Sequence, residues 1–166
     1  MFKGSRIIGA SAVLAFAFAA QAFAQASAPG NCIELKTTAE VEKEVVNEKG
    51  EKSKVLSAAT TVVPGTEVVL TVTANNVCKQ PSDKVVINNP VPEHMTLVPG
   101  SVIGAGSDIT YSVDGKTFAP AGKLTITVDG ATRSARAEEY RHIRWEFKNS
   151  LAPGASAFGR FRAVLN

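Results

Sequence analysis

The sequence predicts an all-β protein, an antiparallel β-sandwich with an N-terminal hairpin extension. Short runs of alternating apolar and polar residues recur along the chain, most clearly at residues 68–74, VVLTVTA. Alternation with a period of two is typical of a strand with one buried face. Turn signals such as Asp114-Gly115 and Asp129-Gly130 separate the runs. Many short strands divided by turns indicate a sandwich.

The first 24 residues have the pattern of a secretory signal peptide. Lys3 and Arg6 form a basic start, and residues 7–20 are apolar and rich in alanine, in the order that such peptides require. The alternative is an uncleaved membrane anchor, but a spanning helix needs about 20 apolar residues and this run is shorter. We therefore expect an exported protein, in the periplasm or at the cell surface.

The cleavage site follows the apolar run. Residues 22–24 read Ala-Phe-Ala, so we place the cut between Ala24 and Gln25. A second small-residue pattern at residues 26–28 lies farther from the apolar run. The expected organisation is then a flexible leader, an N-terminal strand and hairpin segment, and a sandwich core, at residues 25–31, 32–63 and 64–166.

Length and charge limit the classes of function. Cleavage after residue 24 leaves 142 of 166 residues, which suits one domain. Lys3 and Arg6 leave with the signal peptide, so 16 basic residues remain against 15 acidic ones and the formal net charge falls from +3 to +1. Such a balance argues against nucleic-acid binding. No later stretch has the length of a membrane span, so we expect no transmembrane segment after cleavage.

Two cysteines, Cys32 and Cys78, remain in the mature chain. An even number of cysteines in an oxidising compartment predicts a disulfide. The alternative is two separate buried thiols. A bridge would stabilise the fold by about 4 kcal/mol, because it closes a long loop in the unfolded chain, and it would fasten the N-terminal segment to the sheet.

The N-terminal segment is predicted to form a hairpin. Residues 33–46 are rich in β-branched side chains, although the charged run at 40–46 also fits a helical spacing. Residues 47–50, Asn-Glu-Lys-Gly, supply a turn, and a second strand is expected over 55–63. We regard the first strand as a candidate assembly strand that adds to the sheet edge of another molecule. Its apolar positions are Ile33, Leu35, Val41 and Val45.

Two predicted strands supply the centre of the core. Residues 68–74 place Leu70 and Val72 on one face. Residues 142–147, HIRWEF, alternate in the same way and carry Trp145, the only tryptophan. A core position for Trp145 is favoured over an exposed aromatic platform for a ligand.

Four of the remaining strands are short and end at prolines, glycines or Asp-Gly pairs, and the last strand closes the chain. Residues 131–140 are the one later segment predicted to be helical or irregular. Strands are expected at residues 84–88, 101–103, 109–113, 124–128 and 158–165.

The order of these segments resembles a known family. The segments VVLTVTANN, VVINNPVPEHMTLVPGS, YSVDGKTF, HIRWEF and LAPGASAFGRFRA together resemble the domain of unknown function eleven. That family comprises immunoglobulin-like β-sandwich modules of exported and surface proteins of bacteria and archaea, often repeated many times in one chain. The resemblance covers residues 60–165 and implies an immunoglobulin-like sandwich, a structural or adhesive role and no shared catalytic residues. The cysteines and residues 32–63 fall outside the shared pattern, and the module occurs once.

Patterns for catalysis and metal binding are missing from the sequence. His94 and His142 are separated by several predicted strands, without the ligand spacing of a zinc or iron site. Convergence of Asp108, Ser112 and His142 in one pocket would indicate an enzyme, and we do not expect it. We predict no catalytic, cofactor or metal site. Three aspartates near turns are candidates for calcium, although aspartate in such turns more often binds its own backbone: Asp108, Asp114 and Asp129.

These observations favour a non-catalytic structural or adhesive module that acts by protein association, with self-assembly at the cell envelope or surface as one form. The alternative is a periplasmic accessory module that binds a polysaccharide or another envelope protein through its loops. The aromatic candidates for such a loop site are Tyr111, Phe118 and Tyr140.

Overall fold

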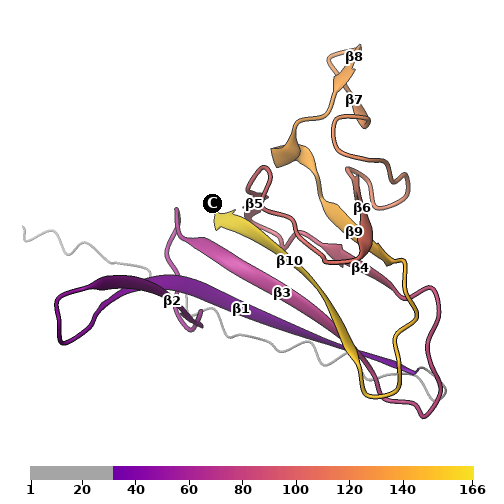
Figure 1. The fold of residues 1–166 in the computed structure, drawn as a ribbon. Helices are drawn as coiled ribbons and strands as arrows, with labels where there is room; N and C mark the ends of the chain where they lie inside the picture. The colour runs from indigo at the N-terminus through magenta and orange to yellow at the C-terminus, as the bar shows by residue number, and fades with distance from the viewer. Residues whose placement is uncertain (1–31) are drawn as a thin grey trace, which may run out of the picture.

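The computed structural model describes residues 32–166, and in this range the chain forms an all-β sandwich (Figure 1). One sheet has five strands in the order β2-β1-β3-β10-β5, a second has three in the order β4-β9-β6, and β7 and β8 form a separate two-stranded sheet. Every strand pair is antiparallel. The predicted antiparallel sandwich with an N-terminal hairpin is confirmed. The predicted signal peptide, cleavage site and leader lie outside the described residues.

The strands vary in length, and the longest belong to the five-stranded sheet. Their bounds in chain order are β1 (Ile33–Val46), β2 (Lys52–Ala58), β3 (Glu67–Asn76), β4 (Val86–Pro90), β5 (Met95–Leu97), β6 (Ser107–Ser112), β7 (Thr125–Val128), β8 (Ala131–Ser134), β9 (His142–Phe147) and β10 (Ser156–Leu165), with a 3₁₀ helix, η1, at Ala137–Glu139.

The first hairpin follows the prediction in β1 and departs from it in β2. β1 is a strand over its whole predicted length, including the charged run. Asn47 supports the turn, because its Oδ1 accepts hydrogen bonds from the backbone N–H groups of Lys49 and Glu51, both at 2.9 Å. β2 ends at Ala58 instead of residue 63. The reason is topological: β2 and β3 flank β1 on opposite sides, so the chain must leave the ladder and cross β1.

The core lies between the two larger sheets. Leu70 and Val72 of β3 and Phe161 of β10 contribute from the five-stranded sheet, and Trp145 of β9 contributes from the other. Their exposed fractions are between 0% and 7%. The predicted core positions of Leu70, Val72 and Trp145 are therefore the observed ones.

The indole of Trp145 occupies a site that two glycines keep open. A Cβ atom at Gly104 or Gly159 would lie 2.4 Å from an indole carbon, closer than packed atoms tolerate. The indole Nε1 donates a hydrogen bond to the Ile103 carbonyl at 3.0 Å, which satisfies the polar atom of a buried tryptophan.

The prediction for residues 131–140 is wrong in part. Residues 131–134 form β8, which pairs with β7 through a tight turn in which Asp129 and Gly130 both have positive φ, as a type I′ hairpin requires. Only η1 is helical. All four residues of β8 are exposed, so the sequence lacks the apolar alternation that would have revealed a strand.

The predicted disulfide is present. Cys32 and Cys78 are bonded, with Cα atoms 5.0 Å apart, and they lie just before β1 and just after β3. Ile33 pairs with Asn76 beside them. The bridge thus fastens the start of β1, while the β1–β2 turn lies at the other end of that strand.

Candidate functional site: the edge of the five-stranded sheet

β1 has different neighbours along its two halves. Residues 33–40 pair with β3, and residues 40–46 pair with β2. The pairing with β3 ends where Glu40 lies opposite Val69. The rest of β1 and β2 form a hairpin that extends beyond β3, and Figure 1 shows its turn on the side away from the second sheet. We call residues 41–58 the β1–β2 hairpin.

Among the described residues, β2 is an edge strand that pairs only with β1. One position beyond β2, in the same register, the Ala59 N–H donates to the Ala39 carbonyl at 3.0 Å. Directly bonded pairs alternate along an antiparallel ladder, so Ser53, Val55 and Ser57 direct their backbone groups toward β1. The intervening residues direct theirs outward: Lys52, Lys54, Leu56 and Ala58.

The hairpin exposes apolar side chains on both of its faces. Val45 and Val55 are 41% and 42% exposed and continue the inner face of the five-stranded sheet. Val46 and Leu56, on the opposite face, are 59% and 38% exposed. Grouped exposed apolar side chains mark interaction surfaces on soluble proteins.

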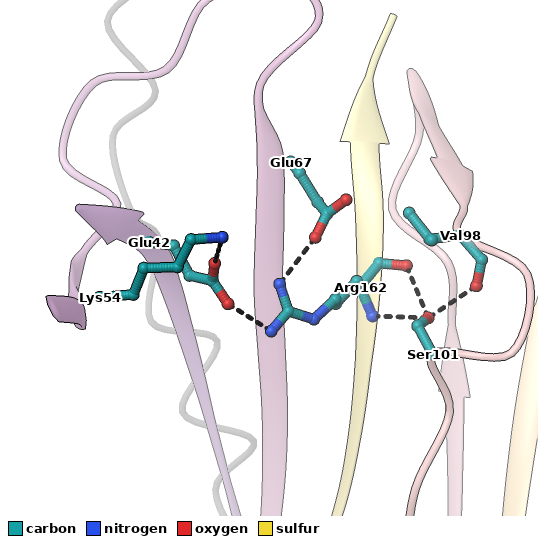
Figure 2. Close-up of polar contacts among 6 residues, drawn as sticks. All are labelled: Glu42, Lys54, Glu67, Val98, Ser101 and Arg162. Carbon is teal, nitrogen blue, oxygen red and sulfur yellow. Dashed lines mark hydrogen bonds and ion pairs between the residues drawn. The ribbon is translucent and has the colours of Figure 1, made fainter. Parts of the chain in front are cut away.

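A charged cluster joins the hairpin to the sheet (Figure 2). Arg162 of β10 donates to Glu67 of β3 at 2.7 Å and to Glu42 of β1 at 2.5 Å. Lys54 of β2 also contacts Glu42, at 3.2 Å. These bonds, from Arg162 first and Lys54 second, lower the pKa of Glu42, and the bonds to Glu67 and Glu42 raise the pKa of Arg162. Ser101 Oγ accepts a hydrogen bond from the Arg162 backbone N–H at 3.0 Å.

The cluster lines a solvent-open depression of about 450 Å³ on the sheet. The charged groups around it already pair with one another, so the depression presents no unpaired buried charge to a ligand. We interpret the cluster as a brace that sets the angle of the hairpin. The lining residues are Val41, Glu42, Glu44, Lys54, Thr66, Glu67 and Arg162.

The four apolar residues of the candidate assembly strand lie on one face of β1. Ile33, Leu35 and Val41 are partly buried against the core, and Val45 lies near the turn. β1 is already held by β3 over residues 33–40, so its transfer to another molecule would require breaking that ladder. The edge that can receive a strand in place belongs to β2, which the sequence did not single out.

The three residues that would have indicated an enzyme do not converge. Ser112 lies opposite His142 in the β6–β9 ladder, whereas Asp108 lies opposite Glu146. Asp108 is four residues along β6 from Ser112, or about 13 Å in an extended strand. Ser112 Oγ instead donates to Asp114 Oδ1 at 2.9 Å.

Two of the three aspartates considered for calcium have structural partners, and the third, Asp129, has positive φ in the β7–β8 turn. Asp114 Oδ1 accepts hydrogen bonds from the backbone N–H groups of Thr117 and Lys116 at 2.9 and 2.8 Å, which lower its pKa to about 2. Asp108 pairs with Lys148 at 2.7 Å. Within residues 32–166, no three His, Cys, Asp or Glu side chains are grouped so that they could hold a metal ion.

The aromatic residues considered for a loop site pack within the fold. Tyr140 is buried, and its hydroxyl accepts a hydrogen bond from the Gly122 N–H at 2.9 Å. Tyr111 stacks on Tyr140 with ring centroids 4.7 Å apart. The guanidinium carbon of Arg144 lies 3.6 Å from the ring centroid of Phe118. These rings do not form a flat exposed platform for a sugar.

The β1–β2 hairpin is thus the candidate interaction surface of the described residues. It combines an edge of seven residues, exposed apolar side chains and a charged brace. None of the helical structure in residues 32–166 is long and apolar enough to cross a membrane. No protein-family model matches the chain, and no curated protein or solved structure is significantly similar to it.

Proposed function

We propose that this protein is an exported, non-catalytic structural module that acts by protein association through the β1–β2 hairpin. The observation that carries the proposal is the outward edge of β2 beside exposed valine and leucine side chains. A strand from a partner can add to such an edge, where backbone hydrogen bonds give affinity and alternate side chains give specificity.

Location at the cell envelope or surface is part of the proposal. The Cys32–Cys78 disulfide supports it, because disulfides persist in oxidising compartments outside the cytosol. The signal-peptide pattern of residues 1–24 supports export. The resemblance of residues 60–165 to the domain of unknown function eleven points to the same structural or adhesive class.

The edge of β2 lacks two of the features that protect edge strands, prolines and bulges, and the charges that it carries are partly offset. Natural sheets block their edges with prolines, bulges or charges. β2 contains no proline, and its seven pairs with β1 follow one another without a bulge. Its two lysines have partners on β1, Lys52 with Glu44 at 2.8 Å and Lys54 with Glu42 at 3.2 Å. Their charges are therefore partly offset before a partner arrives.

The brace lowers the cost of association. Arg162 is bonded to Glu42 on the hairpin and to Glu67 on β3, so the two parts are linked before binding. Each exposed ion pair contributes only about 0–1 kcal/mol. A surface that is already ordered loses less conformational freedom when it binds.

The proposal is tested by removing one outward backbone donor. The N–H of Lys54 points away from β1, so Lys54→Pro removes it without breaking a β1–β2 hydrogen bond. Lys54→Ser keeps the N–H and loses the same charge, which makes it the matched control. In detergent-free envelope extracts, size-exclusion chromatography should give the wild type and Lys54→Ser a mass above the monomer. Lys54→Pro should elute as a monomer. The proposal would be refuted if the wild type elutes as a monomer, or if Lys54→Pro still elutes above the monomer mass.

A further inference from the structure

We infer that the partner strand at β2 is β2 of a second copy of this chain, with a two-fold axis passing beside Val55. This inference rests on the proposed function and names its partner. A two-fold contact uses the same surface on both molecules, so the strand must be complementary to itself in antiparallel orientation. Three properties of Lys52–Ala58 meet that requirement: hydrogen-bond parity, charge and length.

Hydrogen-bond parity selects the register. The outward backbone groups belong to Lys52, Lys54, Leu56 and Ala58, and these must face one another across the axis. They do so when Lys52 lies opposite Ala58 of the second copy and Lys54 opposite Leu56. Val55 then faces Val55 of the second copy as a non-bonded pair, where side chains are closest and Cα atoms are about 4.5 Å apart.

Charge and length select the same register. A slide of two residues in one direction would place Lys54 opposite Lys54, and like charges directly opposite are destabilising. A slide of two in the other direction would leave Lys52 facing a position beyond the end of β2. A slide of one residue would place residues whose backbone groups point outward opposite residues whose backbone groups point toward β1, so no hydrogen bonds would form between them. Only the register centred on Val55 pairs all seven residues of both strands.

The side chains also match in that register. On one face, the exposed side chain of Val55 packs against Val55 of the second copy. On the other face, Lys54 lies beside Leu56 of the second copy, whose neighbour on β1 is Glu42. The apolar stem of a lysine covers apolar surface while its ammonium stays in water. Lys54 keeps its ion pair with Glu42 of the same chain and also comes near Glu42 of the second copy, which lies on β1 beyond that copy's Leu56.

The geometry closes the assembly as a dimer. β5, at the opposite edge of the same sheet, has three residues, of which Met95 and Leu97 are buried, and Pro99 follows shortly after. That edge is too short to repeat the β2 contact. The two five-stranded sheets would join into one continuous sheet. Both β2 edges would then be paired, so no β2 edge would be left to bind a third copy.

Cysteine pairing tests the register directly. Val55→Cys places two sulfurs beside the axis, at a Cα separation of about 4.5 Å that a disulfide accepts. Under mild oxidation we expect a covalent dimer on a non-reducing gel. Ser53→Cys is the matched control, because Ser53 is also exposed and on the same face but would face Ser57 of the second copy. It should cross-link poorly alone and well when mixed with Ser57→Cys.

Light scattering on the mature wild type over a concentration series should give twice the monomer mass, with dissociation on dilution. Lys54→Pro should stay a monomer at every concentration. The inference is overturned if the wild type stays monomeric, or if Ser53→Cys cross-links alone as efficiently as Val55→Cys. A monomeric purified protein whose complex in envelope extracts is still lost in Lys54→Pro would refute self-pairing and leave the proposed function standing.

Discussion

The two halves of the five-stranded sheet both carry valines on the inner face and have different surroundings. In the half beneath the second sheet, residues such as Val72 and Phe161 are almost completely buried. In the hairpin half, Val45 and Val55 continue the same face but remain exposed, because the second sheet does not reach them. Valines on one face of a sheet thus stabilise the fold where the second sheet covers them, and at the exposed edge they provide the surface that we propose for association.

The largest expected effect is on the stability of the covered half. Replacing Cys32 and Cys78 by serine should lower the free energy of unfolding by about 4 kcal/mol, because the unfolded chain regains the freedom of a long loop. Urea titration with fluorescence of Trp145 measures it. Association of the folded variant through β2 should survive, since the bridge lies at the far end of β1. An unchanged midpoint would contradict this prediction.

A smaller loss is expected from Gly159→Ala. The added Cβ would lie 2.4 Å from the indole of Trp145, and overpacking of a core costs about 1–3 kcal/mol. Thermal and urea unfolding measure the loss, with Phe158→Ala, at an exposed neighbouring position, as the control. If Gly159→Ala unfolds like the wild type, the glycine is not required for the packing.

A substitution in the hairpin half should disrupt association and leave the free energy of unfolding almost unchanged. Val55→Lys should abolish association, because it places two ammonium groups beside each other at the axis. Its free energy of unfolding should change by about 0.5 kcal/mol or less, as for most exposed sites. Light scattering and urea unfolding on the same sample separate the two effects. Val128→Lys, in the other protruding hairpin, is the control and should leave association intact.

The smallest expected effect is the acid response of the brace. The pKa of Glu42 is lowered in the folded protein, mainly by its hydrogen bond with Arg162. A lowered pKa means that the brace is complete above the ordinary carboxyl pKa and is lost as the pH falls through the folded value. Amide exchange in the hairpin should therefore quicken below about pH 4 relative to β3. In Glu42→Gln this pH-dependent difference should disappear, and its persistence would assign the response to another group.

The sequence predicted the elements whose signals are local. β1, β3 and β9 were recognised from alternation and β-branched residues, and β9 was located to the residue. The end of β2 was misplaced because it depends on where the chain crosses β1. β8 was missed because a fully exposed strand has no apolar period.

The candidate site was harder to predict because it depends on strand order. The cysteine pair could be predicted, since an even number of cysteines and an expected oxidising compartment favour a disulfide. Glu42, Glu67 and Arg162 are far apart in the sequence and meet only because β1, β3 and β10 are adjacent. The outward edge of β2 likewise follows from its place beside β1. No local pattern in a single sequence specifies such neighbours.

The position of the disulfide has a mechanical consequence. Tension applied to the proposed dimer would enter through β2 and pass along β1 toward its first residue. There Cys32 is covalently joined to Cys78, at the end of β3, so the load would pass into a central strand through a covalent bond. The hydrogen bonds between β1 and β3 would be shielded from shear at that end. The molecule would then yield first at the β2 contact, which can re-form, before its sandwich opens.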